Sequence, residues 1–346
     1  MRHIQPLSTL LLVFAKLITV RASETMTNVS NLELNGIDIS ASKMRHIKGV
    51  SLMLSSLCLV NTLSQHKQVL KLPCLYNFAS FKKSTHFPFF NLSQMSSTSY
   101  FVTGGNRGIG LALVKELSSD AKNTVVATAR EPNSANDLKD WAVKHPNVKI
   151  VQLDVSSSKS VEAAAEETAA LLPDGLDVLV SNAGVLKDIG KYLDHPDELY
   201  IEQFNVNAVG PVRLVRAFKP LLDKKDTREV AVVSSLVGSL NVELPVGFSG
   251  YGVSKAAANY IVKGLIQELS PEGYSLVAVH PGLVGSDMGD DTFVQLGNEV
   301  SGQLKSALPL LTPGESAKAI KENVLTDLKA KNAGKFLSYE GSELPW

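Results

Sequence analysis

The chain has 346 residues, of which 44% are hydrophobic, and its 34 basic and 34 acidic side chains give a net charge of zero. A zero net charge argues against a nucleic-acid-binding protein, and two cysteines cannot form a disulfide framework. The 24 glycines and 15 prolines exclude a collagen-like or broadly disordered chain, so the length predicts one or two globular domains.

The charge is unevenly divided along the chain. Residues 1–94 contain 10 Lys or Arg and 3 Asp or Glu, whereas residues 95–346 contain 24 and 31, so the neutral total is the sum of +7 and −7. Both cysteines, Cys58 and Cys74, lie in the first part, while 22 of the 24 glycines lie in the second. The chain therefore has two parts of different composition.

Residues 1–22 have the outline of a secretory signal, with a basic start, an apolar stretch and a small residue, Ala22, at a cleavage position. No apolar run there reaches the roughly 18 to 20 residues of a membrane-spanning helix, so we predict no transmembrane segment. Residues 23–94 show no sustained helical or strand period, and we expect residues 1–94 as a whole to form a non-globular extension.

Three interpretations of this extension stay open: translation that truly begins at Met95, a targeting presequence, or an accessory disordered tail. We expect a cytoplasmic protein, with the secretory pathway as the alternative if residues 1–22 act as a signal peptide.

Apolar runs and helical segments alternate along residues 95–346. The apolar runs lie at 98–102, 124–130, 148–155, 176–184, 229–235, 274–282 and 335–341. Strands that are apolar throughout are buried on both faces, and strands separated by helices pair in parallel through crossover connections. The sequence therefore predicts, over residues 95–346, a single doubly wound α/β domain of the Rossmann type with about seven parallel strands. Its ligand crevice should lie at the carboxyl ends of the strands.

A glycine-rich turn, TGGNRGIG at residues 103–110, follows the first predicted strand. Glycines let the backbone approach a pyrophosphate, which the free N–H groups of the next helix can hold. Arg107 lies in this turn, and Arg130 closes the second strand, where an NAD enzyme commonly carries an acid. An arginine suits a 2′-phosphate, so we predict NADP as the cofactor. Two alternatives stay open: the glycine-rich segment is only a flexible turn between strand and helix, and Arg130 is a solvated surface residue.

Tyr251 and Lys255 stand four residues apart in a segment that favours a helix, so their side chains share one face. A nearby ammonium favours the phenolate and lowers a tyrosine pKa from its ordinary value of about 10, which would help Tyr251 exchange a proton with a carbonyl. Alone, this spacing usually marks a solvated helix face. In this chain the Tyr251–Lys255 pair follows a glycine turn, an NAG turn and a VVSS strand end. This is the order that a single mechanism of proton and hydride transfer requires.

This order of motifs resembles the short-chain dehydrogenase/reductase family over residues 98–346. TGGNRGIG is similar to the family's TGxxxGIG, YGVSK to its YxxxK, and SNAG at 181–184 to its NNAG, with serine in place of the first asparagine. LDV at 153–155 resembles the adenine-contacting turn. PGLVGS at 281–286 resembles PGxxxT, with Ser286 in place of threonine.

The resemblance implies four catalytic residues. Ser235 would orient the substrate carbonyl, and Tyr251 would be the general acid. Lys255 would hold the nicotinamide ribose and tune Tyr251, while Asn207 would keep a proton-relay water in place. These roles suit the chemistry, because hydrogen-bond donors at a carbonyl oxygen stabilise the negative charge that develops there during hydride transfer.

The resemblance also implies where the cofactor binds. The expected positions are Gly104, Asn106, Arg107, Gly108, Ile109, Arg130, Asp154, Val155, Asn182, Ala183, Gly184, Tyr251, Lys255, Pro281, Gly282, Val284 and Ser286. The interval of 16 residues from Ser235 to Tyr251 is longer than the family's usual one, which leaves Ser234 and Ser239 as alternative partners. We expect no metal site, because the histidines are scattered along the sequence.

Two segments, 236–250 and 285–312, are expected to be variable loops that contact the substrate, the second as a lid. The apolar residues of the lid segment are Met288, Phe293, Val294, Leu296 and Leu304. They suggest a hydrophobic or aromatic ketone, or they simply pack the lid against the domain. The HPGLVGSDMG and GKFLSYEGSELPW segments resemble carbonyl reductases of the sniffer and C-factor type, and in particular fungal ketoreductases of the norsolorinic acid type.

We therefore predict an NADPH-dependent carbonyl reductase that acts on a small-molecule ketone, with an aromatic polyketide of fungal secondary metabolism as one candidate. The alternatives are an NADP-linked alcohol dehydrogenase and a non-catalytic signalling protein of the C-factor type. The presence of Tyr251 and Lys255 favours catalysis. A homodimer through helices near Asn207 and Tyr251 is left open, and Tyr260 is expected to pack against the core.

Overall fold

The computed structural model describes residues 97–187, 189–243 and 248–346, and the side chain of Ala307 is not described. The predictions for the extension, residues 1–94, therefore lie outside the described residues. Within the described part of the chain, no helix is both long and apolar enough to cross a lipid bilayer.

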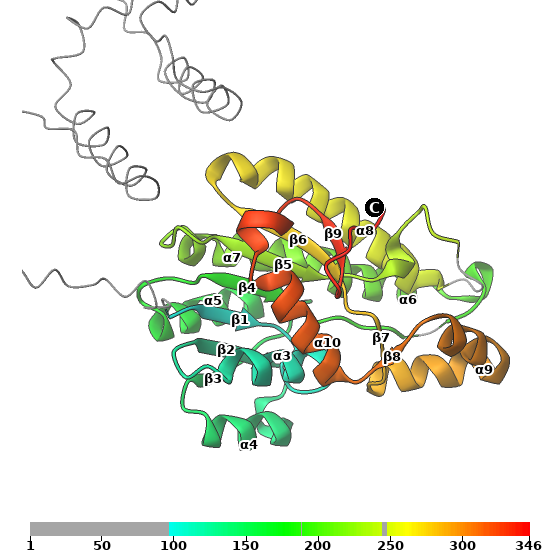
Figure 1. Cartoon of the computed structure of the whole chain (residues 1–346), viewed down its shortest axis with the longest axis horizontal. Helices are drawn as coiled ribbons and strands as arrows, with labels where there is room; N and C mark the ends of the chain where they lie inside the picture. The colour runs from blue at the N-terminus through cyan, green and yellow to red at the C-terminus, as the bar shows by residue number, and fades with distance from the viewer. Residues whose placement is uncertain (1–96, 188, 244–247) are drawn as a thin grey trace, which may run out of the picture. The chain divides into compact units, whose positions relative to one another are not determined.

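Seven strands form one parallel sheet in the order β3-β2-β1-β4-β5-β6-β9 (Figure 1). Their bounds are β1 Ser99–Val102, β2 Thr124–Ala129, β3 Val148–Gln152, β4 Val178–Ser181, β5 Glu229–Val233, β6 Ser275–His280 and β9 Phe336–Ser338. The strand order changes direction between β1 and β4, which places a ligand crevice at the carboxyl ends of these strands. This arrangement confirms the predicted fold class and sheet.

The central strands are buried on both faces, as their apolar composition predicts. Every residue of β4 and of β5 is buried. Neighbouring residues of a strand point to opposite sides of the sheet, so Leu179 packs into one core cluster and Val180 into the other. The sheet therefore separates two apolar layers, each of which needs helices to cover it.

Helices cover both faces (Figure 1). The first core cluster contains residues from α5 (Ser158–Leu171), α7 (Gly210–Leu222) and α8 (Ser249–Leu269). The second contains residues from α3 (Gly108–Ser118), α4 (Asn136–Lys144) and α10 (Pro313–Ile320). The other elements are α6 (Asp197–Phe204), β7 (Leu283–Val284), α9 (Asp287–Ala307) and β8 (Leu310–Leu311), and the single turns η2 (Pro132–Ser134), η3 (Tyr192–Asp194), η4 (Asn205–Val209), η5 (Leu236–Gly238), η6 (Ser270–Glu272), η7 (Lys321–Leu325) and η8 (Leu328–Asn332).

Two local predictions are wrong. The segment 285–312 is not a loop but contains helix α9, because the Ser286 hydroxyl accepts a hydrogen bond from the Gly289 amide (3.3 Å) and caps the helix start. Tyr260 does not pack against the core but is 81% exposed. Val253, seven residues earlier on the same face of α8, is also exposed, so this face points outward.

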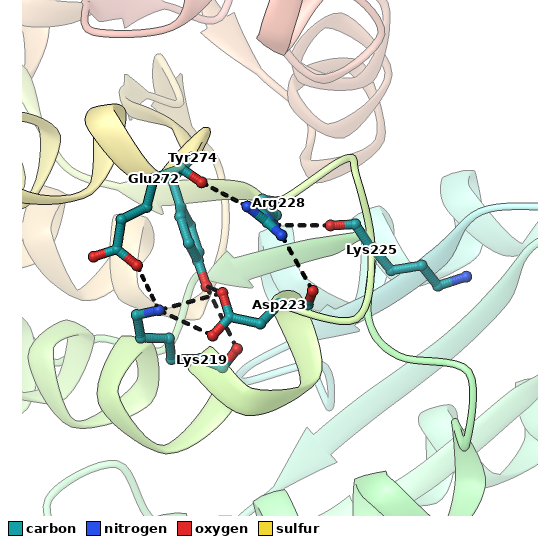
Figure 2. Close-up of polar contacts among 6 residues, drawn as sticks. All are labelled: Lys219, Asp223, Lys225, Arg228, Glu272 and Tyr274. Atoms are coloured by element: carbon teal, nitrogen blue, oxygen red, sulfur yellow. Dashed lines mark hydrogen bonds and ion pairs between the residues drawn. The ribbon is translucent and has the colours of Figure 1, made fainter. Parts of the chain in front are cut away.

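A polar network joins the end of α7 to the start of β6, at the amino-terminal ends of the strands (Figure 2). The Tyr274 hydroxyl donates to Asp223 (2.7 Å), and the Lys219 ammonium binds both Asp223 (2.9 Å) and Glu272 (2.8 Å). The Arg228 guanidinium donates to the Glu272 carbonyl (2.6 Å). Lys219, Asp223, Arg228 and Glu272 all have hydrogen-bond or ion-pair partners within this network, which indicates a structural role.

Candidate active site

A cavity of about 670 Å³ lies at the carboxyl ends of the strands, and the segments that follow β1, β2, β4, β5 and β6 line it. Each residue that the sequence predicted for cofactor binding or catalysis lines this cavity except Asn207, which is buried beside it. The fold therefore brings together side chains from segments that are widely separated in the sequence.

The glycines of the turn between β1 and α3 are required by its backbone conformation and close packing. Gly104 and Gly108 have φ values of +66° and +55°, which disfavour other residues. A Cβ atom at Gly110 would lie 2.0 Å from the Gly104 carbonyl oxygen. No side chain caps the first turn of α3, so its N–H groups face the cavity mouth uncovered. This cradle fits a pyrophosphate, which bare helix N–H groups attract.

Thr103, which the sequence analysis did not select, holds the turn against β4. Its hydroxyl accepts hydrogen bonds from the Asn182 and Ala183 amides, both at 2.9 Å. The Asn182 side chain donates to the Thr103 carbonyl at 2.8 Å. Thr103 could have been selected from the sequence because it is the first residue of the TGG motif. The residues that it binds belong to the NAG turn.

Two arginines and one aspartate border the outer part of the cavity. Arg107 is exposed and forms an ion pair with Asp287 of α9 (2.9 Å), and Arg130 is exposed at the end of β2. Partial burial opposes ionisation of Asp154, but hydrogen bonds from Ser156 (2.7 and 2.9 Å) and the Arg130 charge outweigh it and lower the pKa of Asp154. The carboxylate is therefore ionised and held in place near neutral pH.

Tyr251 and Lys255 share the inward face of α8. The Lys255 ammonium is 5.7 Å from the centre of the Tyr251 ring and donates to the Val233 carbonyl (2.9 Å). Burial lowers the pKa of Lys255 to about 8. Burial also raises the pKa of Tyr251 to about 12, against the opposing effect of a hydrogen bond with Ser235. The expected lowering of the Tyr251 pKa by Lys255 is therefore wrong for this structure, because burial dominates and the opposing influence comes from Ser235 and not from Lys255.

The structure distinguishes the three candidate serines. Ser235 is half-buried, lies two residues after the end of β5, and forms the hydrogen bond with Tyr251. The Ser234 hydroxyl is buried and donates to an asparagine of α8 (2.5 Å). The Ser239 hydroxyl donates to the Trp346 carbonyl (3.4 Å). Ser235 is the one of the three whose hydroxyl is paired with the tyrosine.

Asn207 lies in the π-helical turn η4, a type of turn that is frequent at functional sites. Its amide nitrogen donates to the Val185 carbonyl (2.8 Å) and to the Ser254 hydroxyl (2.9 Å). Its amide oxygen accepts from the Val185 N–H (2.8 Å). Both donors are used within the protein, and the oxygen retains one accepting position.

Part of the cavity lining is apolar. Its apolar lining includes Leu186, Val237, Phe248, Met288, Phe293, Leu304 and Leu308. The lid segment therefore contributes Met288, Phe293 and Leu304, whereas Val294 is 81% exposed and Leu296 does not line the cavity. A hydrogen bond from the Ile189 amide to Gln295 (2.8 Å) links the segment after β4 to α9.

In the three described stretches of the chain, no group of three His, Cys, Asp or Glu side chains could hold a metal ion.

Comparison with known proteins matches this chain to one family. The family model described as short chain dehydrogenase matches residues 99–296. An uncharacterized oxidoreductase of Schizosaccharomyces pombe is 42% identical over 249 residues, which cover 71% of this chain and 97% of that protein. A short-chain dehydrogenase of Pyricularia oryzae is 33% identical over 259 residues, which cover 72% of this chain and 99% of that protein.

Solved structures give the same picture. The NADPH-bound carbonyl reductase from chicken fatty liver is 30% identical, with a TM-score of 0.63 over 73% of this chain and 100% of that one. The carbonyl reductase Sniffer of D. melanogaster is 27% identical, with a TM-score of 0.63 over 72% of this chain and 100% of that one.

Proposed function

The chain belongs to the short-chain dehydrogenase family and is an NAD(P)-dependent oxidoreductase, and on this premise we propose that it is an NADPH-dependent carbonyl reductase. It would reduce a ketone to a secondary alcohol. The observation that carries the proposal is that Ser235, Tyr251 and Lys255 line the same cavity as an uncapped helix N-terminus and two arginines. The names of the two carbonyl reductases with similar structures support this direction of reaction.

When bound, NADPH supplies the hydride. The glycine turn and the start of α3 would hold its pyrophosphate. Arg107 and Arg130 would bind the 2′-phosphate through charge-assisted hydrogen bonds, and Asp154 would border the adenine. The solved relative with bound NADPH supports the choice of phosphorylated cofactor.

The remaining chemistry belongs to side chains of this chain. Because burial raises the pKa of Tyr251 to about 12, the phenol is protonated at neutral pH and can donate its proton to the carbonyl oxygen as the carbonyl carbon is reduced. Ser235 would place a second donor on the same oxygen, where negative charge develops. The Lys255 ammonium would favour the resulting tyrosinate, and a proton from water would restore the phenol.

A hydrophobic ketone is the substrate that fits the apolar part of the cavity lining. The side chains that Phe248, Met288 and Phe293 bring to this part of the cavity are apolar, so a carboxylated or phosphorylated substrate would lose its hydration without gaining a partner there. An aromatic polyketide is one candidate of this kind.

An NADPH oxidation assay of the full chain over aromatic, aliphatic and carboxylated ketones tests the proposal. Turnover of apolar ketones is expected, with little turnover of carboxylated ones. The Tyr251→Phe variant should bind NADPH, measured by quenching of tryptophan fluorescence, and should lose at least about 100-fold in kcat because the proton donor is missing. A Tyr251→Phe variant with full reductase activity would contradict the proposed role of this residue.

A further inference from the structure

The pairing of β5 with β6 ends within one residue of the proposed substrate serine. The Ser234 amide donates to the Val279 carbonyl (2.8 Å), which is the last backbone bond between the two strands. In a continued parallel ladder the next amide, that of Leu236, would donate to the Pro281 carbonyl. That carbonyl instead accepts the Ser316 hydroxyl (2.6 Å). The Leu236 amide therefore needs another acceptor.

The side chain of His280 is that acceptor. The Leu236 N–H donates to His280 Nδ1 at 3.2 Å, between residues 44 positions apart in the sequence. An imidazole can accept only when this nitrogen is unprotonated. Burial lowers the pKa of His280 to about 4, so the ring is neutral at pH 7 and its proton lies on Nε2. The side chain bond takes the place of the missing backbone bond.

The consequence falls on Ser235, which lies between the two anchored amides. Apart from its hydrogen bond with Tyr251, the Ser235 hydroxyl makes a long contact with the Val237 amide (3.4 Å), which restrains the backbone of the strand end weakly. We propose that His280 is a positioning residue, which extends the β5–β6 ladder by one bond and thereby holds Ser235 in place for the substrate carbonyl. The inference rests on the proposed reductase function.

Two variants separate the hydrogen bond from the packing. His280→Leu fills a similar volume without an acceptor, whereas the Asn side chain of His280→Asn can place its oxygen near the position of Nδ1. We expect His280→Leu to lower kcat about 10- to 100-fold and His280→Asn to recover it to within about threefold of the unchanged protein. His280 lines the cavity beside Pro281 and Gly282, so the dissociation constant of NADPH is measured for both variants. It should change less than about threefold, and a larger change would show that His280 contacts the cofactor directly and would overturn the positioning role.

A double-mutant cycle with Ser235→Ala tests whether His280 acts through Ser235. If it does, His280→Leu should lower kcat by less than about threefold in the Ser235→Ala background. A full additional loss in that background, or an Asn variant as slow as the Leu variant, would overturn the proposal. A purely structural role would reduce kcat equally in both backgrounds.

Hydrogen–deuterium exchange of peptides that span residues 234–238 gives a measurement that needs no turnover. The full chain should exchange faster at the strand end in His280→Leu and at the original rate in His280→Asn. Unchanged exchange in His280→Leu would refute the hydrogen bond even if the protein proves to be an active reductase. Faster exchange in a protein that reduces no ketone would support the hydrogen bond and reject the proposed function instead.

Discussion

Burial shifts the pKa values of Tyr251 and Lys255, both on α8, in opposite directions. Desolvation disfavours each charged form, so the pKa of Tyr251 rises to about 12 while that of Lys255 falls to about 8. The hydrogen bond from the lysine to the Val233 carbonyl keeps its head group near the ring (2.9 Å). The phenol therefore stays protonated near neutral pH, as the proposed proton donor must be.

At the same scale, we predict that Arg130 determines the cofactor preference. Arg130→Asp should reverse or abolish the preference for NADPH over NADH, with a change of at least about tenfold in the ratio of kcat/KM values. The aspartate would repel the 2′-phosphate and accept a hydrogen bond from a ribose hydroxyl. Steady-state kinetics with both nucleotides measures this ratio.

A matched control is Lys149→Asp, which introduces the same charge change on the neighbouring strand β3. Lys149 is exposed and does not line the cavity. The control should leave the ratio unchanged. An unaltered preference in Arg130→Asp would remove Arg130 from the cofactor site.

At the scale of elements, α9 is the helix whose shape depends on one residue. Gly297 interrupts it with φ 71° and ψ 170°, a conformation that is essentially restricted to glycine. The part of α9 before this break carries both Phe293, which lines the cavity, and Asp287, which pairs with Arg107. The break therefore sets the direction from which the helix covers the substrate.

Gly297→Ala should destabilise the protein by about 1 to 3 kcal/mol and raise the KM for the ketone, because alanine cannot adopt this conformation without strain. No atom lies within 4 Å of a Cβ atom at this site, so a steric clash would not explain the result. Gly302→Ala is the matched control, since Gly302 also has open space but lies in regular helix. It should stabilise the protein by about 0.5 to 1 kcal/mol in the same thermal unfolding experiment.

At the scale of the whole domain, the two ends of the sheet differ in what surrounds them. The carboxyl ends surround the cavity, while the amino ends are closed by polar contacts such as the network around Tyr274 (Figure 2). Glu229 begins β5 at this end, is 8% exposed and accepts a hydrogen bond from the Lys329 amide (3.3 Å). Burial raises the pKa of Glu229 to about 7.

This raised pKa makes stability depend on pH. Between about pH 4.5 and 7 the unfolded chain releases the Glu229 proton while the folded chain keeps it, so the contribution of this group to stability falls as pH rises. Glu229→Gln keeps an acceptor for the Lys329 amide and removes the titration. It should be more stable than the unchanged protein by roughly 1 to 3 kcal/mol at about pH 8, and by much less at about pH 5. Urea unfolding at both pH values measures the difference, and an equal difference at both would contradict the assignment.

The sequence by itself determined what depends on neighbouring residues. The alternation of apolar runs and helical segments predicted the parallel sheet, because burial on both faces leaves a continuous apolar signal. TGGNRGIG predicted the phosphate cradle, and the four-residue spacing of Tyr251 and Lys255 predicted a shared helix face. These features follow from local backbone geometry.

Tertiary structure alone decided what depends on segments that are distant in the chain. Thr103 meets Asn182 across 79 positions, and His280 meets Leu236 across 44. Desolvation of Tyr251 likewise depends on everything packed around α8, which is why its pKa rises although Lys255 stands one helical turn away. These hydrogen bonds and this burial form only where the folded chain brings distant segments side by side. A local sequence pattern does not show which residues will meet there.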